Sequence, residues 1–266
     1  MYGLRKPKKV KILGLDIAGT VESVGKDVKR FQVGDEVFGD ISGSMFGGFA
    51  EYTCASEDAL TLKPASMSFE QAAAIPHVAV LGLQGLFFKG EVKSGEKILM
   101  NGAGGGLGTL VVQVAKSLGA EVTAVDIGMK LDMLRSLGAD HVIDYTKEDF
   151  TRNGLRYDRI IDVAGFHPIF AYKRALASGG TYGMIGGATS RVMQTLALGP
   201  IIALLGSKKM GVVMHKANKD MDYVIELFED GKLVPVIDRT YPLDEVPDAL
   251  RFFGEAKSQG KILIKI

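Results

Sequence analysis

The sequence of 266 residues contains a single cysteine, Cys54, and carries a formal net charge of only +1. One cysteine excludes an intrachain disulfide and a zinc site built from several cysteines, and it fits a reducing compartment, so we expect a cytoplasmic protein. A net charge near zero gives no reason to expect nucleic acid or an anionic membrane as a partner. The densest basic cluster, residues 5–11, is typical of a solvated terminal segment.

Long apolar runs are also missing. The longest one, residues 192–206, is interrupted by Gly199 and Pro200, and it is shorter than the ~20 residues that a bilayer-spanning helix needs. We therefore expect a buried helix or a segment that lines a pocket there. The first twelve residues lack the apolar core of a signal peptide. With 47% hydrophobic residues, the chain is long enough for one large or two modest domains.

Two common catalytic signatures are absent as well. The sequence has no Gly-X-Ser-X-Gly motif of a serine hydrolase. Its Gly-Lys pairs at Gly25, Gly231 and Gly260 are not followed by serine or threonine, as a phosphate-binding loop requires. The four histidines share no spacing typical of metal ligands, so we expect structural or surface roles and no bound metal. These histidines are His77, His141, His167 and His215.

The most informative pattern lies between residues 97 and 126. Residues 97–100 form a short apolar run, and a glycine-rich turn follows at residues 102–108. Apolar residues then recur at helical spacing, Gly119 ends that helix, and residues 121–125 resume as a strand. A strand, a glycine turn, a helix and a second strand in this order are typical of a dinucleotide-binding unit.

The glycines have a physical role in such a unit. A pyrophosphate can reach main-chain N–H groups at a helix N-terminus only where no side chain intervenes. Here Ala103, Gly105 and Gly108 match an Ala-X-Gly-X-X-Gly variant of the fingerprint, since Leu107 stands where the strict spacing from Gly102 needs its last glycine. A merely tight turn is the alternative. The predicted loop comprises Gly102, Ala103, Gly104, Gly105, Gly106, Leu107 and Gly108.

Strand and helix patterns alternate along the middle of the chain and predict a doubly wound parallel sheet, because parallel neighbours need crossover connections. Residues 12–62 instead show short β-like runs between glycines. The segments after residue 232 do not continue the alternation, so we expect them to return to this first region. There the final strand, residues 261–266, is expected to pair with the glycine-punctuated strands. The six strands predicted for the sheet are residues 97–100, 121–125, 141–143, 159–163, 181–185 and 209–215.

Five motifs in this order resemble the medium-chain dehydrogenase/reductase superfamily, in its zinc-free quinone oxidoreductase and enoyl reductase branch. The resemblance implies a GroES-like β domain from residues 1–67 and 233–266, a Rossmann domain from residues 68–232, and a homodimer. The motifs are GLDIAGTVESVG at 14–25, GDEVFG at 34–39, GGFAEY at 47–52, NGAGGGLG at 101–108 and SLGADHVIDYTKEDF at 136–150.

The chain also departs from the superfamily pattern. Zinc alcohol dehydrogenases carry Gly-His-Glu where this sequence has Gly14, Leu15 and Asp16, so a histidine ligand is missing. The chain begins inside the β domain, which fits a misplaced start, a truncated gene or a naturally shortened form. Because the opening strands usually supply polar residues near the nicotinamide, no catalytic acid is assigned. His77 is the one titratable residue placed near that face, and a buried structural role is favoured for it.

The residues at the adenosine end give opposite signals. Asp126 closes the second strand, where a carboxylate accepts hydrogen bonds from the ribose diol and repels a 2′-phosphate, which favours NAD(H). Lys130 resembles the lysine that NADPH-dependent relatives direct at that phosphate, with a solvated cation as the alternative. We lean slightly to NAD(H). By resemblance, Tyr145 flanks the adenosine, and Ala164 and Ile185 lie along the nicotinamide ribose.

The resemblance implies hydride transfer from reduced nicotinamide to a quinone or to an α,β-unsaturated carbonyl, with no zinc and a small-molecule substrate. One alternative is a nucleotide-binding protein whose shortened β domain does not support turnover. A zinc-free alcohol dehydrogenase is a weaker alternative, because an unactivated alcohol is a poor hydride donor without a Lewis acid.

Overall fold

The structure is a computed structural model that describes residues 12–44 and 46–266. It divides into two compact units. The first comprises the chain up to Val80, Lys216–Gly231 and Pro235–Ile266, and the second comprises Leu81–His215 and Lys232–Val234. These limits differ from the predicted domain limits after residues 67 and 232.

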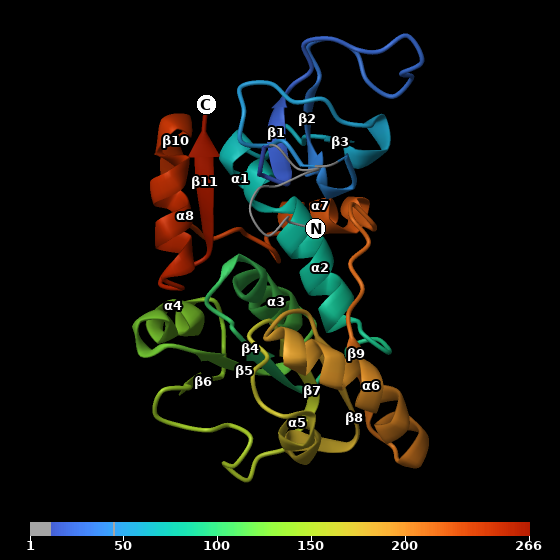
Figure 1. The fold of residues 1–266 in the computed structure, drawn as a ribbon, viewed down its shortest axis with the longest axis vertical. Helices are drawn as coiled ribbons and strands as arrows, with labels where there is room; N and C mark the ends of the chain where they lie inside the picture. The colour runs from blue at the N-terminus through green and yellow to red at the C-terminus, as the bar shows by residue number, and fades with distance from the viewer. Residues whose placement is uncertain (1–11, 45) are drawn as a thin grey trace. The chain divides into compact units, whose positions relative to one another are not determined.

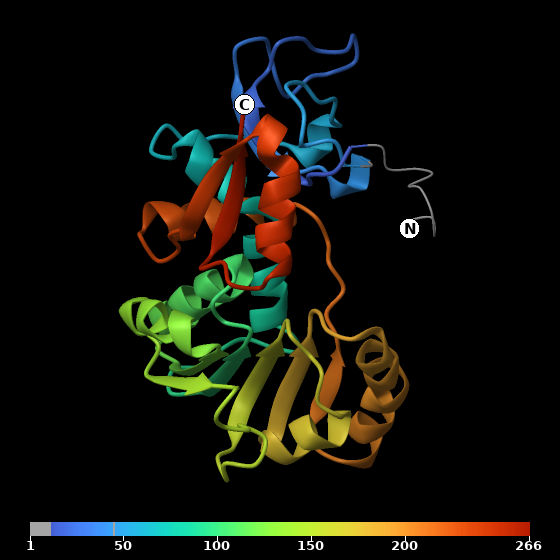
Figure 2. The same cartoon turned by 60° about the vertical axis from the view of Figure 1, so that its left-hand side comes forward.

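The second unit is built on a six-stranded sheet in the order β6-β5-β4-β7-β8-β9. Every neighbouring pair in it is parallel, as Figure 2 shows for the yellow and orange arrows in its lower half. Ile98, Leu99 and Met100 in the central strand β4 are fully buried, as continuous apolar runs in parallel sheets generally are. The strands are β4 (Lys97–Asn101), β5 (Glu121–Asp126), β6 (His141–Asp144), β7 (Tyr157–Asp162), β8 (Leu176–Met184) and β9 (Lys209–Val212).

Helices connect most of these parallel strands, and residues 145–156 between β6 and β7 contain none. The crossovers are α3 (Gly106–Ser117), η3 (Gly128–Lys130) with α4 (Leu131–Ser136), α5 (Ile169–Ala175) and α6 (Thr189–Leu205). The expected doubly wound α/β fold is therefore confirmed, and Figure 1 labels its elements.

The first unit contains two small sheets. One is antiparallel, in the order β1-β2-β3, and the other is a parallel pair of β10 and β11. In Figure 1 helix α8 runs alongside β10 and β11. The strands are β1 (Asp16–Thr20), β2 (Glu36–Asp40), β3 (Thr61–Leu62), β10 (Ile237–Pro242) and β11 (Lys261–Lys265). The helices are η1 (Ser42–Ser44), η2 (Glu57–Ala59), α1 (Phe69–Ala74), α7 (Met221–Glu229), η4 (Leu243–Glu245) and α8 (Val246–Gly254). Helix α2 (Pro76–Leu86) contains the division between the units.

The final strand does not pair as predicted. β11 pairs in parallel with β10, not with the glycine-punctuated strands β1–β3. The alternation of apolar residues predicts a covered face, but it does not specify which strand provides the hydrogen bonds. In β11 the buried residue is Leu263, whereas Ile266 just after the strand is 63% exposed. A salt bridge still connects the strand to that region, because Lys261 Nζ lies 2.5 Å from Asp16 Oδ2 at the start of β1.

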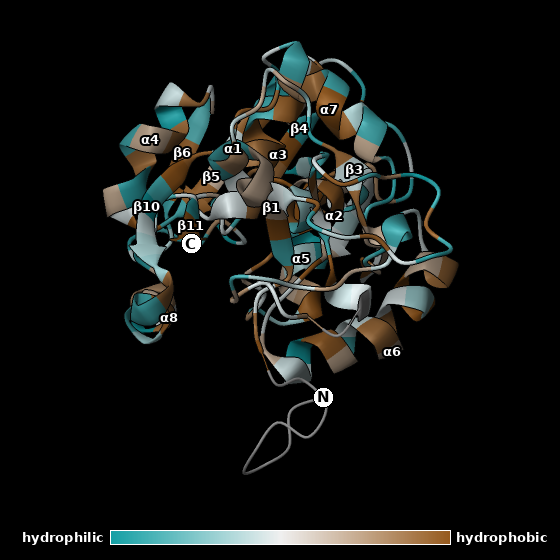
Figure 3. Ribbon diagram, turned by 90° about the horizontal axis from the view of Figure 1, so that it is seen from above, coloured by the Kyte–Doolittle hydropathy of each residue, from teal (hydrophilic) through white to brown (hydrophobic). Residues whose placement is uncertain are grey.

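The apolar run at residues 192–206 also differs from its prediction. It forms most of α6, in which the buried residues are Thr195, Gly199 and Ile202. The alternative of a buried helix was wrong for its C-terminal end, since Leu204 and Leu205 are 85% and 80% exposed. The alternative of a segment that lines a pocket stays a prediction. Only one stripe of α6 packs on the edge strand β9, and Figure 3 shows the hydrophobic colouring along the helix. Among the residues described here, no helix is long and apolar enough to cross a bilayer.

Replacing Lys261 with methionine should destabilise the first unit. The Asp16 side chain is only 5% exposed, so the substitution leaves a buried carboxylate without its cation. We expect the free energy of unfolding to fall by about 2–4 kcal/mol. Breaking a buried ion pair by removing one partner usually costs about 3–5 kcal/mol, so this loss lies at the lower end of that range. Denaturant titration of the purified variant measures this loss.

Lys265→Met provides the matched control. Lys265 Nζ lies 3.6 Å from Glu70 Oε1, and both side chains are largely exposed. An exposed pair contributes less than about 1 kcal/mol. Equal losses in the two variants would show that the Asp16 pair does not stabilise the unit.

Candidate functional site

The glycine-rich segment lies where β4 ends and α3 begins. Helix α3 starts at Gly106 and has Gly105 as its N-cap, so no side chain caps the helix. The first N–H groups of any helix lack intrahelical partners, and the helix dipole places partial positive charge there. This end of α3 therefore has the properties of an anion-binding helix terminus.

Three glycines of this segment differ in the space around them. A Cβ added to Gly102, which has a φ of +81°, would lie 2.4 Å from Val163 Cγ2. A Cβ on Gly108 would lie 2.5 Å from Ala103 Cα, so both positions require glycine for packing alone. A Cβ on Gly105 meets no atom within 4 Å, and the φ of −87° suits any residue. Packing does not explain the glycine at position 105, whereas close approach of a ligand does.

Asp126, at the end of β5, binds the glycine-rich segment directly. Its Oδ2 accepts a hydrogen bond of 2.7 Å from the Gly104 N–H, and its Oδ1 accepts one of 2.8 Å from the Ile127 N–H. Lys130 Nζ lies 3.5 Å from Asp126 Oδ1, and the two side chains are 6% and 9% exposed. A Cβ on Gly104 would lie 2.4 Å from Lys130 Cδ. The carboxylate, the ammonium group and the loop therefore form one buried cluster.

The other predicted residues also follow the carboxyl ends of strands in this sheet. The Tyr145 N–H donates to the Asp126 carbonyl at 3.2 Å, and the Tyr145 side chain is 47% exposed beside β6. Ala164 is exposed just after β7, and Ile185 is half-buried just after β8. The structure thus brings the loop and these residues to one edge of the parallel sheet, where ligands of such folds bind.

Sequence reasoning missed Asp162, the last residue of β7. Its Oδ1 accepts hydrogen bonds from Asn101 Nδ2 at 2.8 Å and from the Ala164 N–H at 3.1 Å. The Tyr182 hydroxyl donates to its Oδ2 at 2.9 Å. Burial raises the pKa of Asp162 above its usual value, although these donors act to lower it. The signal available in the sequence was a polar residue at the end of each of two apolar strands, Asn101 and Asp162.

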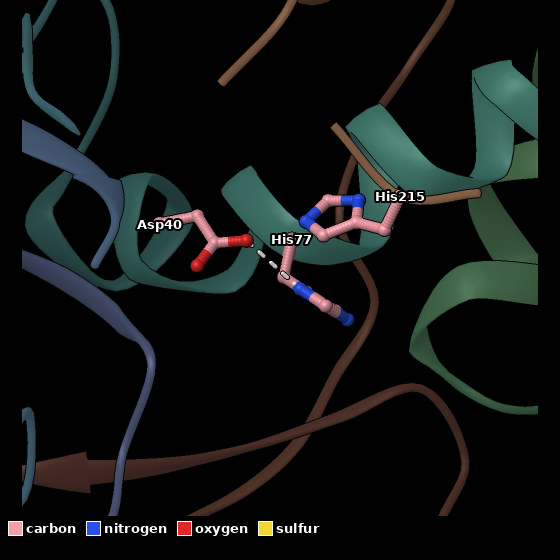
Figure 4. A group of neighbouring side chains, drawn as sticks. All are labelled: Asp40, His77 and His215. Atoms are coloured by element: carbon pink, nitrogen blue, oxygen red, sulfur yellow. Dashed lines mark hydrogen bonds and ion pairs between the residues drawn. The ribbon is translucent and has the colours of Figure 1, made fainter. Parts of the chain in front are cut away.

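Among the histidines, His77 has a well-defined place in the first unit. Its Nδ1 lies 2.9 Å from Oδ2 of Asp40, whose side chain is fully buried (Figure 4). Asp40 Oδ1 accepts a hydrogen bond from the Ser42 N–H at 2.8 Å. Asn218 binds both the N–H and the carbonyl of Asp40 at 2.8 Å. Nothing in the local sequence indicates this arrangement, because its members lie far apart along the chain.

The other three histidines, His141, His167 and His215, lie in the second unit. His141 Nε2 is 3.0 Å from Glu121 Oε1. His167 stacks on Phe166 with ring centroids 4.7 Å apart and makes an edge contact with Phe150. Cys54 is exposed.

Comparison with known proteins identifies relatives over almost the whole chain. The family model of the alcohol dehydrogenase GroES-like domain matches residues 1–65, and that of zinc-binding dehydrogenases matches residues 137–264. A 2-methylene-furan-3-one reductase from Solanum lycopersicum is 36% identical over 94% of this chain, which spans 62% of that protein. A chloroplastic quinone-oxidoreductase homolog from Spinacia oleracea is 33% identical over 96% of this chain and 79% of its own length.

A solved structure agrees with these relatives. The quinone oxidoreductase from Coxiella burnetii is 29% identical and superimposes with a TM-score of 0.85, over 96% of this chain and 79% of that chain.

Proposed function

Because the chain belongs to the medium-chain dehydrogenase/reductase superfamily, among quinone oxidoreductases and enone reductases, we propose that it is an NAD(P)H-dependent oxidoreductase. Its substrate in this proposal is a quinone or an α,β-unsaturated carbonyl compound. The observation that carries the proposal is the open space at Gly105, at an uncapped helix N-terminus that a short turn joins to a parallel strand.

The residues present fit a dinucleotide. Bound reduced nicotinamide supplies the hydride, and the protein binds and orients the dinucleotide and excludes water. The first N–H groups of α3 hold the pyrophosphate, and Asp126 with Lys130 holds the adenosine ribose. Tyr145 flanks the adenosine, while Ala164 and Ile185 lie along the nicotinamide ribose. No residue is proposed as the proton donor.

For the cofactor, we propose a preference for NAD(H). Asp126 is at the position where a carboxylate accepts from the ribose diol and repels a 2′-phosphate. Lys130 is 5% exposed and its ammonium group lies against Asp126, which supports a role as the ion-pair partner of that carboxylate. Zinc independence is also part of the proposal, supported by Leu15 at the histidine position and by a single, exposed cysteine. The same lone cysteine supports a cytoplasmic location.

We also propose that the protein is a homodimer. Strand β9 is an edge strand of the six-stranded sheet, and unpaired edges are usually covered in native proteins. Helix α6 packs on β9 and carries several exposed apolar residues, a feature typical of interaction surfaces. These residues include Met193, Leu196, Ile201, Leu204 and Leu205.

The reductase proposal predicts oxidation of NADH or NADPH by small quinones or enones. Loss of absorbance at the reduced-nicotinamide band measures it with the purified chain. Gly105→Val should raise the KM for the dinucleotide at least about tenfold, because the side chain fills the space left for the pyrophosphate, while the melting temperature falls only slightly because valine is a poorer N-cap than glycine.

Gly19→Val, at another glycine with open surroundings, is the matched control and should leave the KM unchanged. A folded wild-type chain that binds a dinucleotide but does not oxidise it with any of the quinones or enones tested would instead support a nucleotide-binding protein without turnover.

The cofactor proposal predicts opposite effects at the adenosine end. Asp126→Asn removes the charge that repels a 2′-phosphate, so the ratio of kcat/KM for NADPH to that for NADH should rise about tenfold. Lys130→Met should lower this ratio. Asp132→Asn removes a fully exposed charge from the neighbouring helix α4 and should leave the ratio unchanged. A wild-type ratio well above one would refute the preference for NAD(H).

The dimer proposal predicts a molar mass near twice 28.5 kDa by light scattering. Leu204→Glu with Leu205→Glu should shift the mass to that of a monomer, because both residues are exposed in the isolated chain and neither supports its core. A monomeric wild type would contradict the proposal.

A further inference from the structure

One buried residue accepts hydrogen bonds from three strand ends at the candidate site. Asp162 has no exposed surface. Its carboxylate accepts hydrogen bonds from a residue at the end of β4, from a residue in β8 and from a residue in the loop that follows its own strand. Its main-chain carbonyl also accepts two hydrogen bonds from the residues after β8, at 2.7 and 3.2 Å. The donors to the side chain are Asn101, Ala164 and Tyr182, and those to the carbonyl are Ile185 and Gly186.

These contacts set the distance between the glycine-rich segment and the loop after β7. Asn101 directly precedes Gly102, and the Val163 N–H donates to the Asn101 carbonyl at 3.1 Å. The position of an added Cβ on Gly102 lies 2.4 Å from Val163 Cγ2, so the two segments are packed without spare room. A shift at Asp162 therefore moves the turn and the loop relative to each other.

Ala164 and Ile185 each depend on Asp162 through a single hydrogen bond. The Ala164 N–H binds the carboxylate, and the Ile185 N–H binds the carbonyl. The adenosine end has a separate set of contacts on β5, in which Asp126 binds Gly104, Ile127 and Lys130. The contacts that hold the two ends of the site thus converge on two different aspartates.

We propose that Asp162 is a positioning residue for the nicotinamide half of the bound dinucleotide, acting through the loop after β7, whose Ala164 N–H donates to its carboxylate. This inference rests on the proposed dinucleotide-binding function. Asp162 itself is buried beneath the loop. Its side chain orients the segment that lies against the nicotinamide ribose, whereas the adenosine half is held independently by the Asp126 cluster.

The test compares a whole dinucleotide with an adenosine fragment. Calorimetry gives the Kd of NADH and of 5′-AMP, or of NADPH and adenosine 2′,5′-bisphosphate if the wild type prefers NADPH. Asp162→Ala should raise the Kd of the dinucleotide about tenfold or more and change that of the fragment less than about twofold. A general loss of structure would weaken both ligands together.

Asp162→Asn is the conservative variant. Its amide oxygen can still accept from Asn101 and Ala164, and its NH₂ can donate to the Tyr182 hydroxyl, so binding should stay within about threefold of wild type. Ile160→Val is the matched control, because Ile160 is fully buried in the same strand but takes no part in the hydrogen bonds from Ala164 and Ile185 to Asp162. It should leave the ratio of the two Kd values unchanged.

Three results would overturn the proposal. They are unchanged dinucleotide affinity in Asp162→Ala, an equal loss for dinucleotide and fragment, and a shifted ratio in Ile160→Val. If Asp162→Ala does not fold, Tyr182→Phe carries the same test, since it removes only the hydroxyl that donates to the carboxylate. A wild-type chain that binds neither ligand would refute the proposed function itself, which distinguishes the two failures.

Discussion

The parallel register of β4 with its two neighbours is the constraint on which the candidate site depends. In this register Asn101 is paired with Val125 on one side and with Asp162 on the other. The ends of all three strands therefore reach the same edge of the sheet, and the main chain turns there into loops. Each loop can bind its neighbour through short polar contacts only because the strands stop at the same level. The glycine-rich turn takes its place from this edge.

The local parts of the site are predictable from the sequence, since each depends on neighbouring residues. The glycines from Gly102 to Gly108 follow an apolar strand and precede a helical repeat, and the structure has the turn there. The partners of the polar residues are not predictable in this way. Asn101 and Asp162 are 61 residues apart, and Gly104 and Asp126 are 22 apart. The sequence pattern shows that a strand ends in a polar residue. Only the order of the strands in the sheet determines which polar strand ends lie next to each other.

The two predictions that were wrong share one physical cause. The alternation in β11 and the apolar run in α6 both report that a surface is suited to being covered, and neither reports what covers it. β11 pairs with β10, and α6 uses one stripe against β9 and leaves the rest exposed. Apolar periodicity measures a preference for leaving water, which several different neighbours can satisfy equally well.

The buried carboxylates of this protein differ in how their charge is balanced. Asp16 and Asp126 each lie beside a lysine ammonium group. Asp162 is held instead by an amide, a main-chain N–H and a hydroxyl, and burial raises its pKa. A buried group of this kind costs more than an apolar residue of similar volume unless every acceptor is satisfied. Stability alone gives little reason for an aspartate at this position. The hydrogen bonds of its carboxylate give a reason, because an apolar side chain in its place would fill the space but could not bind Asn101, Ala164 and Tyr182.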